Sequence, residues 1–411
     1  MIQERAGTAP CLVYNGPTQE LVISQPDHIR DFYDRYNESH TKPGNLHLGN
    51  PYGFLVPGAA KGQFNQDWSK MRAHFEPPMS FSAISRRAPR FAREIKTWVK
   101  NLDAGPVDSQ LAFQFVVFRM LTLHLYEDAY DDRMFWRVLE LYHLHEKALL
   151  ASTANTSARR QSPSILNWFS VGPAPAAQRF IREWREFNLN IIALARNGQW
   201  TCPIEVVYRA VSAQNDMTED AFLSTLSEIL FMNVDTSSRI LSTIFTNLAA
   251  NATVQNALRL EAQQNEGAGS AYLYRVDTLL HRVLQESMRL CPGLSFSMPE
   301  WTVDAKTIGG YHIPAGTAVV MDAGRLNNDP AIWGTDYDKW DPDRFLRASL
   351  KDVGAGFVRY GVGPAAERCL GKDAADILFK LLVVAVIQEL SLGQTDGEGE
   401  IGKMDLTMAR L

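Results

Sequence analysis

Apolar residues recur at the three- and four-residue spacing of helices along most of this chain, whereas β-prone runs are short and gather in three places. A longer helical run covers 219–251, after the capping residue Thr218, and the spacing is also clear in 91–102, 110–126, 134–150, 178–196 and 273–290. The β-prone runs lie in 11–24, 295–334 and 392–411, each broken by turn residues. The pattern predicts a mainly α protein with small β-sheets, an α+β fold.

One segment near the C-terminus combines glycine, proline and a cysteine. Residues 357–372 read FVRYGVGPAAERCLGK, and an apolar helical run begins directly after Cys369. The cysteine therefore lies at or near a helix N-terminus, where the helix dipole and unpaired backbone N–H groups favour a thiolate. A thiolate is a soft, charged axial ligand for iron, and in haem proteins it favours O–O cleavage. An ordinary buried cysteine is the alternative interpretation.

The order of residues in this segment, Tyr360-Gly-Val-Gly363 followed by Cys369-Leu-Gly371, resembles the haem-binding loop of the cytochrome P-450 family. The family usually places its aromatic residue seven positions before the cysteine and a basic residue two before it. Here Tyr360 is nine positions before Cys369 and Arg368 directly precedes it, which indicates a two-residue insertion. The resemblance implies that Cys369 is the metal ligand of haem b, and that Tyr360, Gly363, Arg368 and Gly371 contact the cofactor.

Two residues earlier in the chain match another motif of the family. Trp68 and Arg72 are four residues apart and share one face of a predicted helix. An indole N–H and a guanidinium are both donors suited to carboxylates, and the resemblance assigns them to the haem propionates. A surface pair with stem packing is the alternative. The Gly-, Pro- and Asn-rich stretch before them, 42–64, resembles by its position the family's substrate-facing loop.

The long helical run carries polar residues near its middle. Asn233, Asp235 and Thr236 stand there among leucine, isoleucine and phenylalanine residues, and buried polar groups cost free energy unless they are bonded or used. In the family this helix crosses the distal face of the haem. The resemblance implies that Asp235 and Thr236 deliver protons to bound dioxygen and that Asn233 supplies hydrogen bonds. The alternative is structural, with Thr236 bonded to a helix carbonyl and Asp235 in a salt bridge.

Two further segments predict a buried charged triad. Glu286 and Arg289 are three residues apart and face the same way on one helix. Arg344 follows within the segment WDPDRF (340–345), and in the family this second arginine joins the pair beneath the haem loop. Buried charges need such additional bonding to be tolerated. We therefore interpret the three residues as structural.

The motifs follow the family's order over nearly the whole chain, so we interpret residues 1–411 as a single haem domain. The resemblance implies a triangular prism with the haem between the long distal helix and the helix after Cys369. The segments 296–299, 323–327 and 233–235 particularly resemble fungal members that oxidise secondary metabolites.

The function implied by the resemblance is that of a monooxygenase, which inserts one atom of O2 into an apolar or aromatic small molecule. Two alternatives stay open. Met232, Asn233 and the insertion motivate a haem-thiolate enzyme of oxidative coupling, dehydration or peroxide-driven oxidation. The absence of the family's first helix motivates a non-catalytic haem-binding protein.

Composition and charge limit the partners. The 411 residues are 45% hydrophobic and 21% charged, with a net charge of −5 and no basic blocks, which does not indicate nucleic acid. The chain has no flavin- or nicotinamide-binding fingerprint, so electrons are expected from NADPH through a separate flavoprotein reductase, or from a ferredoxin. A candidate basic surface for an acidic reductase comprises Lys70, Arg87, Lys372 and Lys380.

Cysteine spacing and hydropathy bear on the compartment. The four cysteines are far apart, and no apolar run approaches the roughly 20 residues of a membrane span. We therefore expect an intracellular protein, soluble as given, and associated with the endoplasmic reticulum if an N-terminal anchor was removed. The apolar residues 165–169 are a candidate access lid or membrane-dipping patch, or alternatively fold back on the core.

Overall fold

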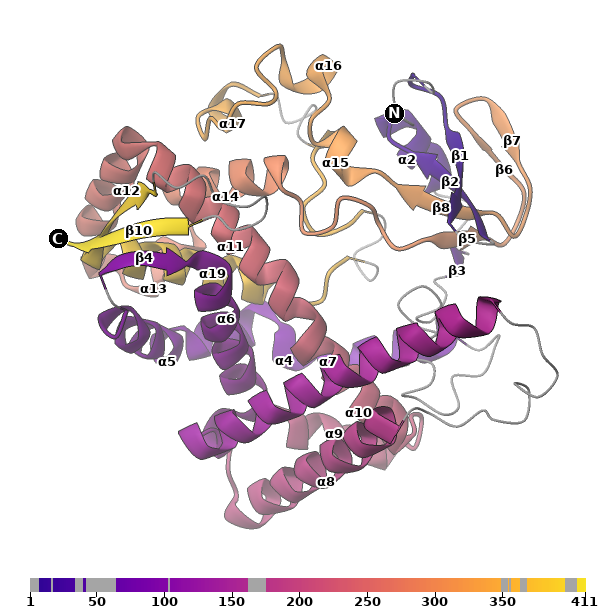
Figure 1. Cartoon of the computed structure of the whole chain (residues 1–411), viewed down its shortest axis with the longest axis horizontal. Helices are drawn as coiled ribbons and strands as arrows, with labels where there is room; N and C mark the ends of the chain where they lie inside the picture. Colours follow the sequence, from indigo (N-terminus) through magenta and orange to yellow (C-terminus); the bar gives the residue numbers. More distant parts are fainter. Residues whose placement is uncertain are drawn as a thin grey trace. The chain divides into compact units, whose positions relative to one another are not determined.

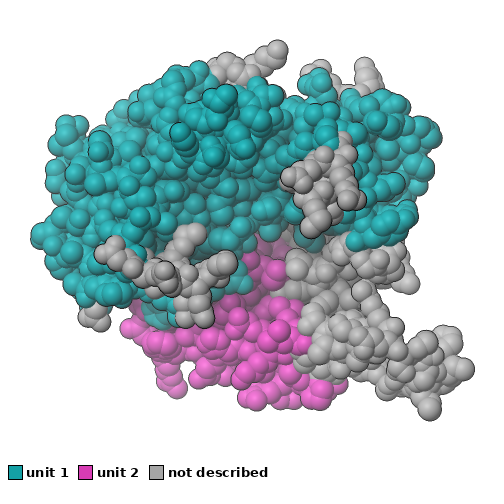
Figure 2. Space-filling view, turned by 45° about the horizontal axis from the view of Figure 1, so that its top comes forward, with its two compact units in different colours: residues 1–41, 79–117, 234–411 teal, residues 42–78, 118–233 magenta. Residues whose placement is uncertain are grey.

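The computed structural model describes residues 7–15, 18–33, 40–41, 64–102, 104–161, 175–348, 354, 356–362, 368–395 and 405–411. The chain divides into two compact units, coloured separately in Figure 2. Unit 1 comprises Met1–Thr41, Met79–Val117 and Val234–Leu411, and unit 2 comprises Lys42–Pro78 and Phe118–Asn233. Most of these residues are helical and the sheets are small, which confirms the predicted α+β composition.

The N-terminal hairpin forms one edge of a five-stranded sheet in unit 1 (Figure 1). The strand order is β1-β2-β8-β5-β3, with the bounds β1 (Cys11–Asn15), β2 (Thr18–Ile23), β3 (His40–Thr41), β5 (Glu300–Thr302) and β8 (Ala318–Met321). The first two strands are antiparallel, as the turn residues between them predict, whereas β2 and β8 are parallel.

Apolar side chains from this sheet and its neighbours form one buried cluster. The neighbours are helix α2 (Pro26–Phe32) and the hairpin of β6 (Lys306–Ile308) and β7 (Tyr311–Ile313). The cluster includes Leu21, Ile23, Phe32, Ile308 and Val319. Alternate residues of β2 contribute to it because successive side chains of a strand point to opposite faces of the sheet.

The C-terminal residues form a second sheet of unit 1. Its order is β4-β10-β9, with the bounds β4 (Gly105–Asp108), β9 (Leu390–Gln394) and β10 (Asp405–Arg410). The antiparallel pairing of β9 and β10 confirms the predicted C-terminal hairpin. Since β4 lies almost three hundred residues earlier in the chain, the sheet ties distant parts of unit 1 together.

Amphipathic helices supply most of the core of unit 1. The longer ones are α5 (Phe81–Lys100), α11 (Asn233–Ala250), α12 (Ala252–Gln264), α14 (Leu279–Leu290) and α19 (Lys372–Glu389), and α6 (Ser109–Tyr126) continues into unit 2. The shorter ones are η4 (Glu266–Ala268), α13 (Ser270–Tyr274), α15 (Ala323–Leu326), α16 (Pro330–Trp333) and α17 (Arg344–Arg347). Helix α5 packs against α19, and its buried residues Ile84, Ala88, Phe91, Ile95 and Val99 recur at helical spacing.

Unit 2 is built from helices around aromatic side chains. They are α4 (Phe64–Met79), η1 (Glu127–Ala129), α7 (Asp132–Gln161), α8 (Pro175–Gly198), α9 (Pro203–Gln214), α10 (Glu219–Ser227) and η3 (Glu228–Met232). The ring of Phe231 lies within about 6 Å, between centroids, of the rings of Phe118, Tyr142, His145, Phe180 and Trp184. Such a core fixes where η3 lies within this unit.

Several helix boundaries differ from the predicted ones. The helix predicted at 91–102 begins at Phe81, because Ser80 caps it by accepting a hydrogen bond from the Ala83 N–H. The prediction of one helix over 273–290 is wrong. The backbone leaves the helix between α13 and α14, and Thr278 caps α14 by accepting from the His281 N–H. Helix α7 continues beyond 150, and α9 and α12 lie outside the predicted ranges.

The long run over 219–251 is helical throughout, but not all of it is α-helix. Thr218 caps it through the Ala221 N–H, as predicted, and the α-helical part ends at Ala250. The five residues of η3 form a π-helix directly before Asn233. Single π-turns inside α-helices are frequently found at functional sites.

Two predicted loops lie outside the described residues. These are 42–63, with only Phe64 of the predicted range beginning α4, and the apolar stretch 165–169. Among the helices of the described ranges, none combines the length and the apolar character that a bilayer crossing requires.

Candidate functional site

Cys369 is exposed in the loop that leads into α19. Its backbone N–H donates to the carbonyl of Tyr360, with 2.9 Å between N and O. Gly361 permits the turn beside this bond because its φ is +85°, and a Cβ there would lie 3.8 Å from the Arg368 Cα. Gly371 is the N-cap residue of α19. The thiol is thus presented just before a helix N-terminus, where an anion is stabilised.

The other predicted haem contacts of this loop are only partly described. Arg368 is exposed next to the cysteine, and a Cβ added at Gly371 would lie 4.0 Å from the Cys369 sulfur. Gly363 and the inserted residues belong to 363–367, outside the part of the chain that the structure describes. Their predicted contacts with a cofactor stay predictions.

The side chain of Tyr360 is bonded to the helix that follows the loop. Its phenol donates to Asp376 in the second turn of α19, at 2.6 Å, and the Arg359 guanidinium donates to the other oxygen of the same carboxylate, at 2.8 Å. Burial, and then the Asp376 carboxylate, raise the pKa of Tyr360 well above its ordinary value, so its hydroxyl remains a donor. Sequence reasoning missed Arg359 and Asp376. The available signal was a carboxylate within the otherwise apolar second turn of the helix.

The start of the loop is held by side chains from the preceding segment. Asn327 is fully buried and bonds both backbone groups of Val358, donating to its carbonyl at 2.9 Å and accepting from its N–H at 2.7 Å. The Trp333 indole donates to the Gly356 carbonyl, and its ring contacts that of Phe357. These contacts hold the backbone that enters the cysteine loop.

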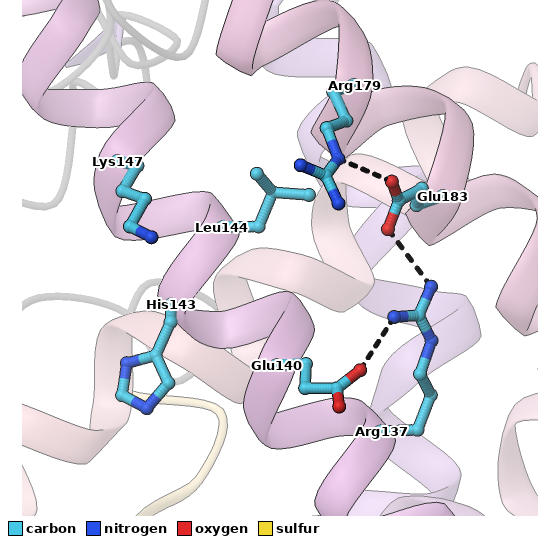
Figure 3. A pocket seen from close by; sticks show the side chains of 7 residues that line it. All are labelled: Arg137, Glu140, His143, Leu144, Lys147, Arg179 and Glu183. Carbon is cyan, nitrogen blue, oxygen red and sulfur yellow. Dashed lines mark hydrogen bonds and ion pairs between the residues drawn. The ribbon is translucent and has the colours of Figure 1, made fainter.

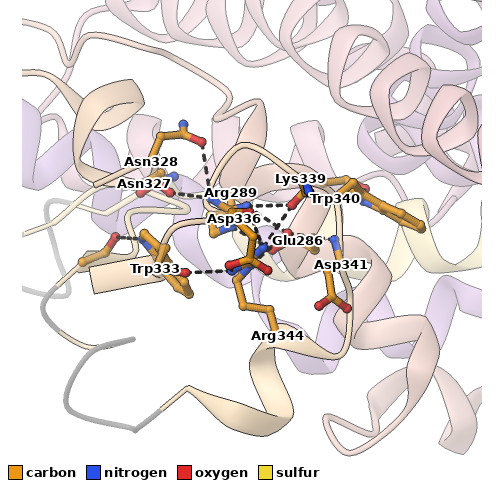
Figure 4. A network of polar contacts seen from close by, with 12 residues as sticks. Glu286, Arg289, Asn327, Asn328, Trp333, Asp336, Lys339, Trp340, Asp341 and Arg344 are labelled. Carbon is orange, nitrogen blue, oxygen red and sulfur yellow. Dashed lines mark hydrogen bonds and ion pairs between the residues drawn. The ribbon is translucent and has the colours of Figure 1, made fainter. Parts of the chain in front are cut away.

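The predicted triad of Glu286, Arg289 and Arg344 is confirmed, and Figure 4 shows it at the centre of a larger polar network. The Arg289 guanidinium makes two bonds to Glu286, of 2.8 and 2.9 Å, and Arg344 makes one of 3.3 Å. Arg344 also contacts Asp336 at 3.0 Å, and the Asp341 N–H donates to Glu286. Glu286 and Arg289 are fully buried, and buried polar groups need hydrogen-bond partners. Accordingly, Arg289 also donates to the Asn327 carbonyl, and Arg344 donates to the Trp333 carbonyl.

The polar residues of the long helix are placed differently from one another. Asp235 is exposed and accepts a hydrogen bond from Gln114 on α6, at 2.7 Å. Thr236 is partly buried beside Gly293, where a Cβ would come within 3.1 Å of the threonine methyl carbon. The Arg239 guanidinium donates to the Gly293 carbonyl, which holds that backbone against α11. The apolar neighbours of Asp235 in the sequence predict that it is buried. This prediction is wrong, because the residue is exposed where Gln114 donates to it.

Asn233 lies at the junction of the π-helix and α11. Its side-chain amide donates to the Ile229 carbonyl, at 2.8 Å, and the residue is exposed. This hydrogen bond connects the first residue of α11 to the π-helix before it. Asn233 therefore has a structural role in the helix besides the hydrogen-bonding role predicted for it.

Trp68 and Arg72 lie on α4 in unit 2, which confirms the helix predicted for them. Arg72 is buried, and its guanidinium is 3.9 Å from the Glu76 carboxylate. The Trp68 side chain lies outside the described part of the structure.

The proposed basic docking surface is wrong in one of its members. Lys380 is buried, and its ammonium donates to the carbonyls of Leu273 and Arg275 at 2.8 and 3.0 Å. Burial lowers its pKa to about 8. A side chain enclosed in this way contributes nothing to a surface that a reductase contacts.

A polar hollow between α7 and α8 of unit 2 contains none of the predicted site residues (Figure 3). Its wall carries a chain of ion pairs in which Glu183 contacts Arg179 at 2.7 Å and Arg137 at 3.0 Å, and Arg137 also contacts Glu140. The hydrogen bond from Arg179 is the largest of the effects that lower the pKa of Glu183. Since these charges already satisfy one another, the hollow has a structural explanation.

This mainly helical chain has an exposed cysteine at the start of α19. It also has a buried triad in which Glu286 and Arg289 of α14 are joined by Arg344. This combination is characteristic of haem-thiolate oxidoreductases, in which a cysteine sulfur is the axial ligand of iron.

The cytochrome P450 family model matches residues 9–408, and the chain belongs to this family. It is 45% identical, over 409 residues, to the cytochrome P450 monooxygenase opdB of Penicillium oxalicum, an alignment that covers 98% of this chain and 82% of the relative. The identity to the monooxygenase apdB of Emericella nidulans is 37% over 417 residues, with 94% and 80% covered. For lepD of Aspergillus flavus it is 33% over 428 residues, with 99% and 83% covered.

Membership of the family implies haem iron and O2 as cofactor and co-substrate, and the cysteine loop fits such a cofactor. The sulfur of Cys369 is a suitable donor for iron, and the loop backbone that carries it is held by the Tyr360 carbonyl. The cytochrome P450 prediction made from the loop and from the order of the motifs is therefore confirmed.

Proposed function

We propose that this chain is a single haem domain that inserts one oxygen atom from O2 into an apolar or aromatic small molecule, an intermediate of fungal secondary metabolism. Electrons come from NADPH through a separate flavoprotein reductase, or from a ferredoxin. The observation that carries the proposal is the exposed Cys369 at the start of α19, held at its N–H by Tyr360, in a chain that matches the cytochrome P450 family along its length. When bound, the haem supplies the site at which O2 is reduced and activated.

We propose that Asp235 and Thr236 of the long helix transfer protons. Asp235 accepts from Gln114, which holds its carboxylate in one orientation, and Thr236 is confined by Gly293. We assign to this pair the delivery of protons from solvent, because Asp235 is exposed while Thr236 is partly buried. Removal of the Thr236 hydroxyl is expected to lower the amount of product formed per O2 consumed.

Further assignments follow the donor chemistry of the side chains. Trp68 and Arg72 are proposed to bind the haem propionates, since an indole N–H and a guanidinium both donate to carboxylates. Tyr360, Gly363, Arg368 and Gly371 are proposed to surround the cofactor on the side of the cysteine.

The first test is the absorption spectrum of the dithionite-reduced, carbon-monoxide-bound protein. The wild type and a Cys11→Ser control are expected to show a strongly red-shifted Soret band that is lost in Cys369→Ser. Cys11 is a suitable control because it is partly buried in β1, far in sequence from the loop. A band in the ordinary position for histidine-ligated haem in the wild type would refute thiolate ligation.

A second candidate function is haem-thiolate chemistry without O2 insertion, such as oxidative coupling, dehydration or peroxide-driven oxidation. The π-helix and Asn233, whose amide is bonded to Ile229, favour it because they alter the helix segment next to the proposed proton path. Turnover under 18O-labelled O2 gas separates the two. Label in the product supports monooxygenation, whereas unlabelled product, with activity driven by peroxide, supports the second candidate.

A further inference from the structure

Asp376 joins two consecutive residues of the cysteine loop to α19, and the proposed function leaves this carboxylate without a role. Its two oxygens accept separate hydrogen bonds, one from the Tyr360 phenol at 2.6 Å and one from the Arg359 guanidinium at 2.8 Å. The Arg359 guanidinium also lies over the Tyr360 ring, 4.8 Å from its centroid. The three side chains are partly buried and brace one another, so each restricts the rotamers of the other two.

The bonded carboxylate is linked to the cysteine through Tyr360. The phenol of Tyr360 contacts α19 and its backbone carbonyl accepts from the Cys369 N–H, at 2.9 Å. The chain then runs from Cys369 through the N-cap residue Gly371 back to Asp376. These bonds close a ring that starts and ends at the cysteine. The position of the Tyr360 side chain is therefore coupled to the backbone that carries the sulfur.

The length of the loop gives such an anchor an entropic cost to offset. Tyr360 and Cys369 are nine positions apart, and the entropy lost on ordering a loop rises with its length. The entry to the loop is held by Asn327, through both backbone groups of Val358. Within the described part of the loop, the Tyr360 phenol and the Arg359 guanidinium both bond to α19, the helix that follows the cysteine.

We propose that Asp376 is a positioning residue, which holds Cys369 in the orientation that ligates iron by anchoring Tyr360 and Arg359. The inference rests on the proposed ligation of haem by Cys369. Without the carboxylate, Tyr360 loses its acceptor, the Cys369 N–H loses a fixed partner, and the sulfur leaves the ligating geometry more often. The consequence is loss of thiolate ligation, not merely loss of stability.

The test uses the haem-loaded protein and the variants Asp376→Asn, Tyr360→Phe and their combination. Asp373→Asn is the matched control, because it removes the same charge from the same helix, one turn earlier, at a partly buried position. In the reduced, carbon-monoxide-bound state, the red-shifted Soret band reports thiolate ligation and the band in the ordinary position reports its loss. The ferric/ferrous midpoint potential of Tyr360→Phe is a second readout, because this variant changes no formal charge while loss of the thiolate as axial ligand changes the potential.

Asp376→Asn is expected to raise the rate at which the red-shifted band converts to the ordinary one by about tenfold, the effect of losing a charge-assisted hydrogen bond. Tyr360→Phe retains the ring and is expected to act in the same direction. The combination is expected not to exceed Asp376→Asn, because the charge-assisted bond to the Tyr360 phenol is already lost in that variant. The control is expected to remain within about twofold of the wild type.

Three results would overturn the inference. They are an unchanged conversion rate in Asp376→Asn, an equal effect of Asp373→Asn, and additive effects in the combination. If Asp376→Asn fails to retain haem, Tyr360→Phe decides, because an unchanged spectrum there excludes the link. A wild type without the red-shifted band would overturn the proposed ligation together with this inference, whereas a normal wild type beside an unaffected Asp376→Asn overturns the inference alone.

Discussion

Replacement of Glu286 by Gln should destabilise the protein strongly, although no contact with substrate or cofactor is involved. The change keeps the shape of the side chain and removes its charge. Glu286 and Arg289 are fully buried and joined by two bonds, and Arg344 contacts the same carboxylate. An amide in this place meets guanidinium donors with its own NH2 group, so at least one of the present bonds is lost.

The size of the effect follows from what remains after the substitution. Among the described residues, Glu286 is the carboxylate that contacts Arg289, whereas Arg344 retains Asp336 at 3.0 Å. One guanidinium is therefore left buried without a countercharge. Removing one partner of a buried pair costs about 3–5 kcal/mol. The pair itself need not be a net source of stability, because desolvation opposes its formation. The free energy of unfolding of the double variant Glu286→Met, Arg289→Met should therefore lie closer to the wild-type value than that of Glu286→Gln.

The assay is urea unfolding followed by far-UV circular dichroism, with Glu266→Gln as an exposed control that should change the free energy of unfolding by less than about 0.5 kcal/mol. With a slope of about 3 kcal/mol per molar urea, the midpoint of Glu286→Gln should fall by about 1 M or more. A fall no larger than that of the control would refute the argument. So would a double variant less stable than the single one, because it would mean that uncompensated charge is not the cause.

Three other outcomes are expected. Burial lowers the pKa of both His145 and His281 from 6.5 to about 4. The unfolded chain therefore binds protons that the folded chain does not, and the free energy of unfolding should fall as the pH drops from about 6.5 to about 4. His281→Leu should reduce that pH dependence by up to one proton in urea titrations. Gly293→Ala should displace Thr236, whose methyl carbon would be 3.1 Å from the new Cβ, and lower product formed per O2 consumed. Lys380→Met should destabilise by about 1–3 kcal/mol in the same urea assay, because the buried Leu273 carbonyl and the Arg275 carbonyl lose their donor.

Each of these expectations has a contradicting result. An unchanged pH slope in His281→Leu would mean that this histidine is not kept neutral by burial. If Gly293→Ala and the wild type form equal amounts of product per O2 consumed, Thr236 is not confined by Gly293. A stabilised Lys380→Met would indicate that desolvation of the ammonium outweighs its two hydrogen bonds.

Local chemistry made several parts of the structure predictable. The hairpin of β1 and β2 follows from two β-prone runs around turn residues, and the start of the long helix follows from the capping side chain of Thr218. The pairing of Glu286 with Arg289 follows from their spacing on one helix. In each case the groups that interact are near one another in the chain, so their spacing already restricts how they can meet.

Other features depended on segments that come together only in the folded chain. Nothing around Lys380 in the sequence indicates that its ammonium donates to the Leu273 carbonyl of α13. Nor does the sequence indicate that Asp376 accepts hydrogen bonds from Tyr360 and Arg359 of the loop before it. The bond from Gln114 to Asp235 joins two helices across more than a hundred residues.

The sequence alone therefore determined the class of this protein, because a cysteine at a helix start and the ordered motifs are local patterns of residue type and spacing. The tertiary structure alone decided which polar side chains became neighbours. Burial makes an unpartnered polar group costly, and so partners are selected by the packing of distant segments rather than by their distance along the chain.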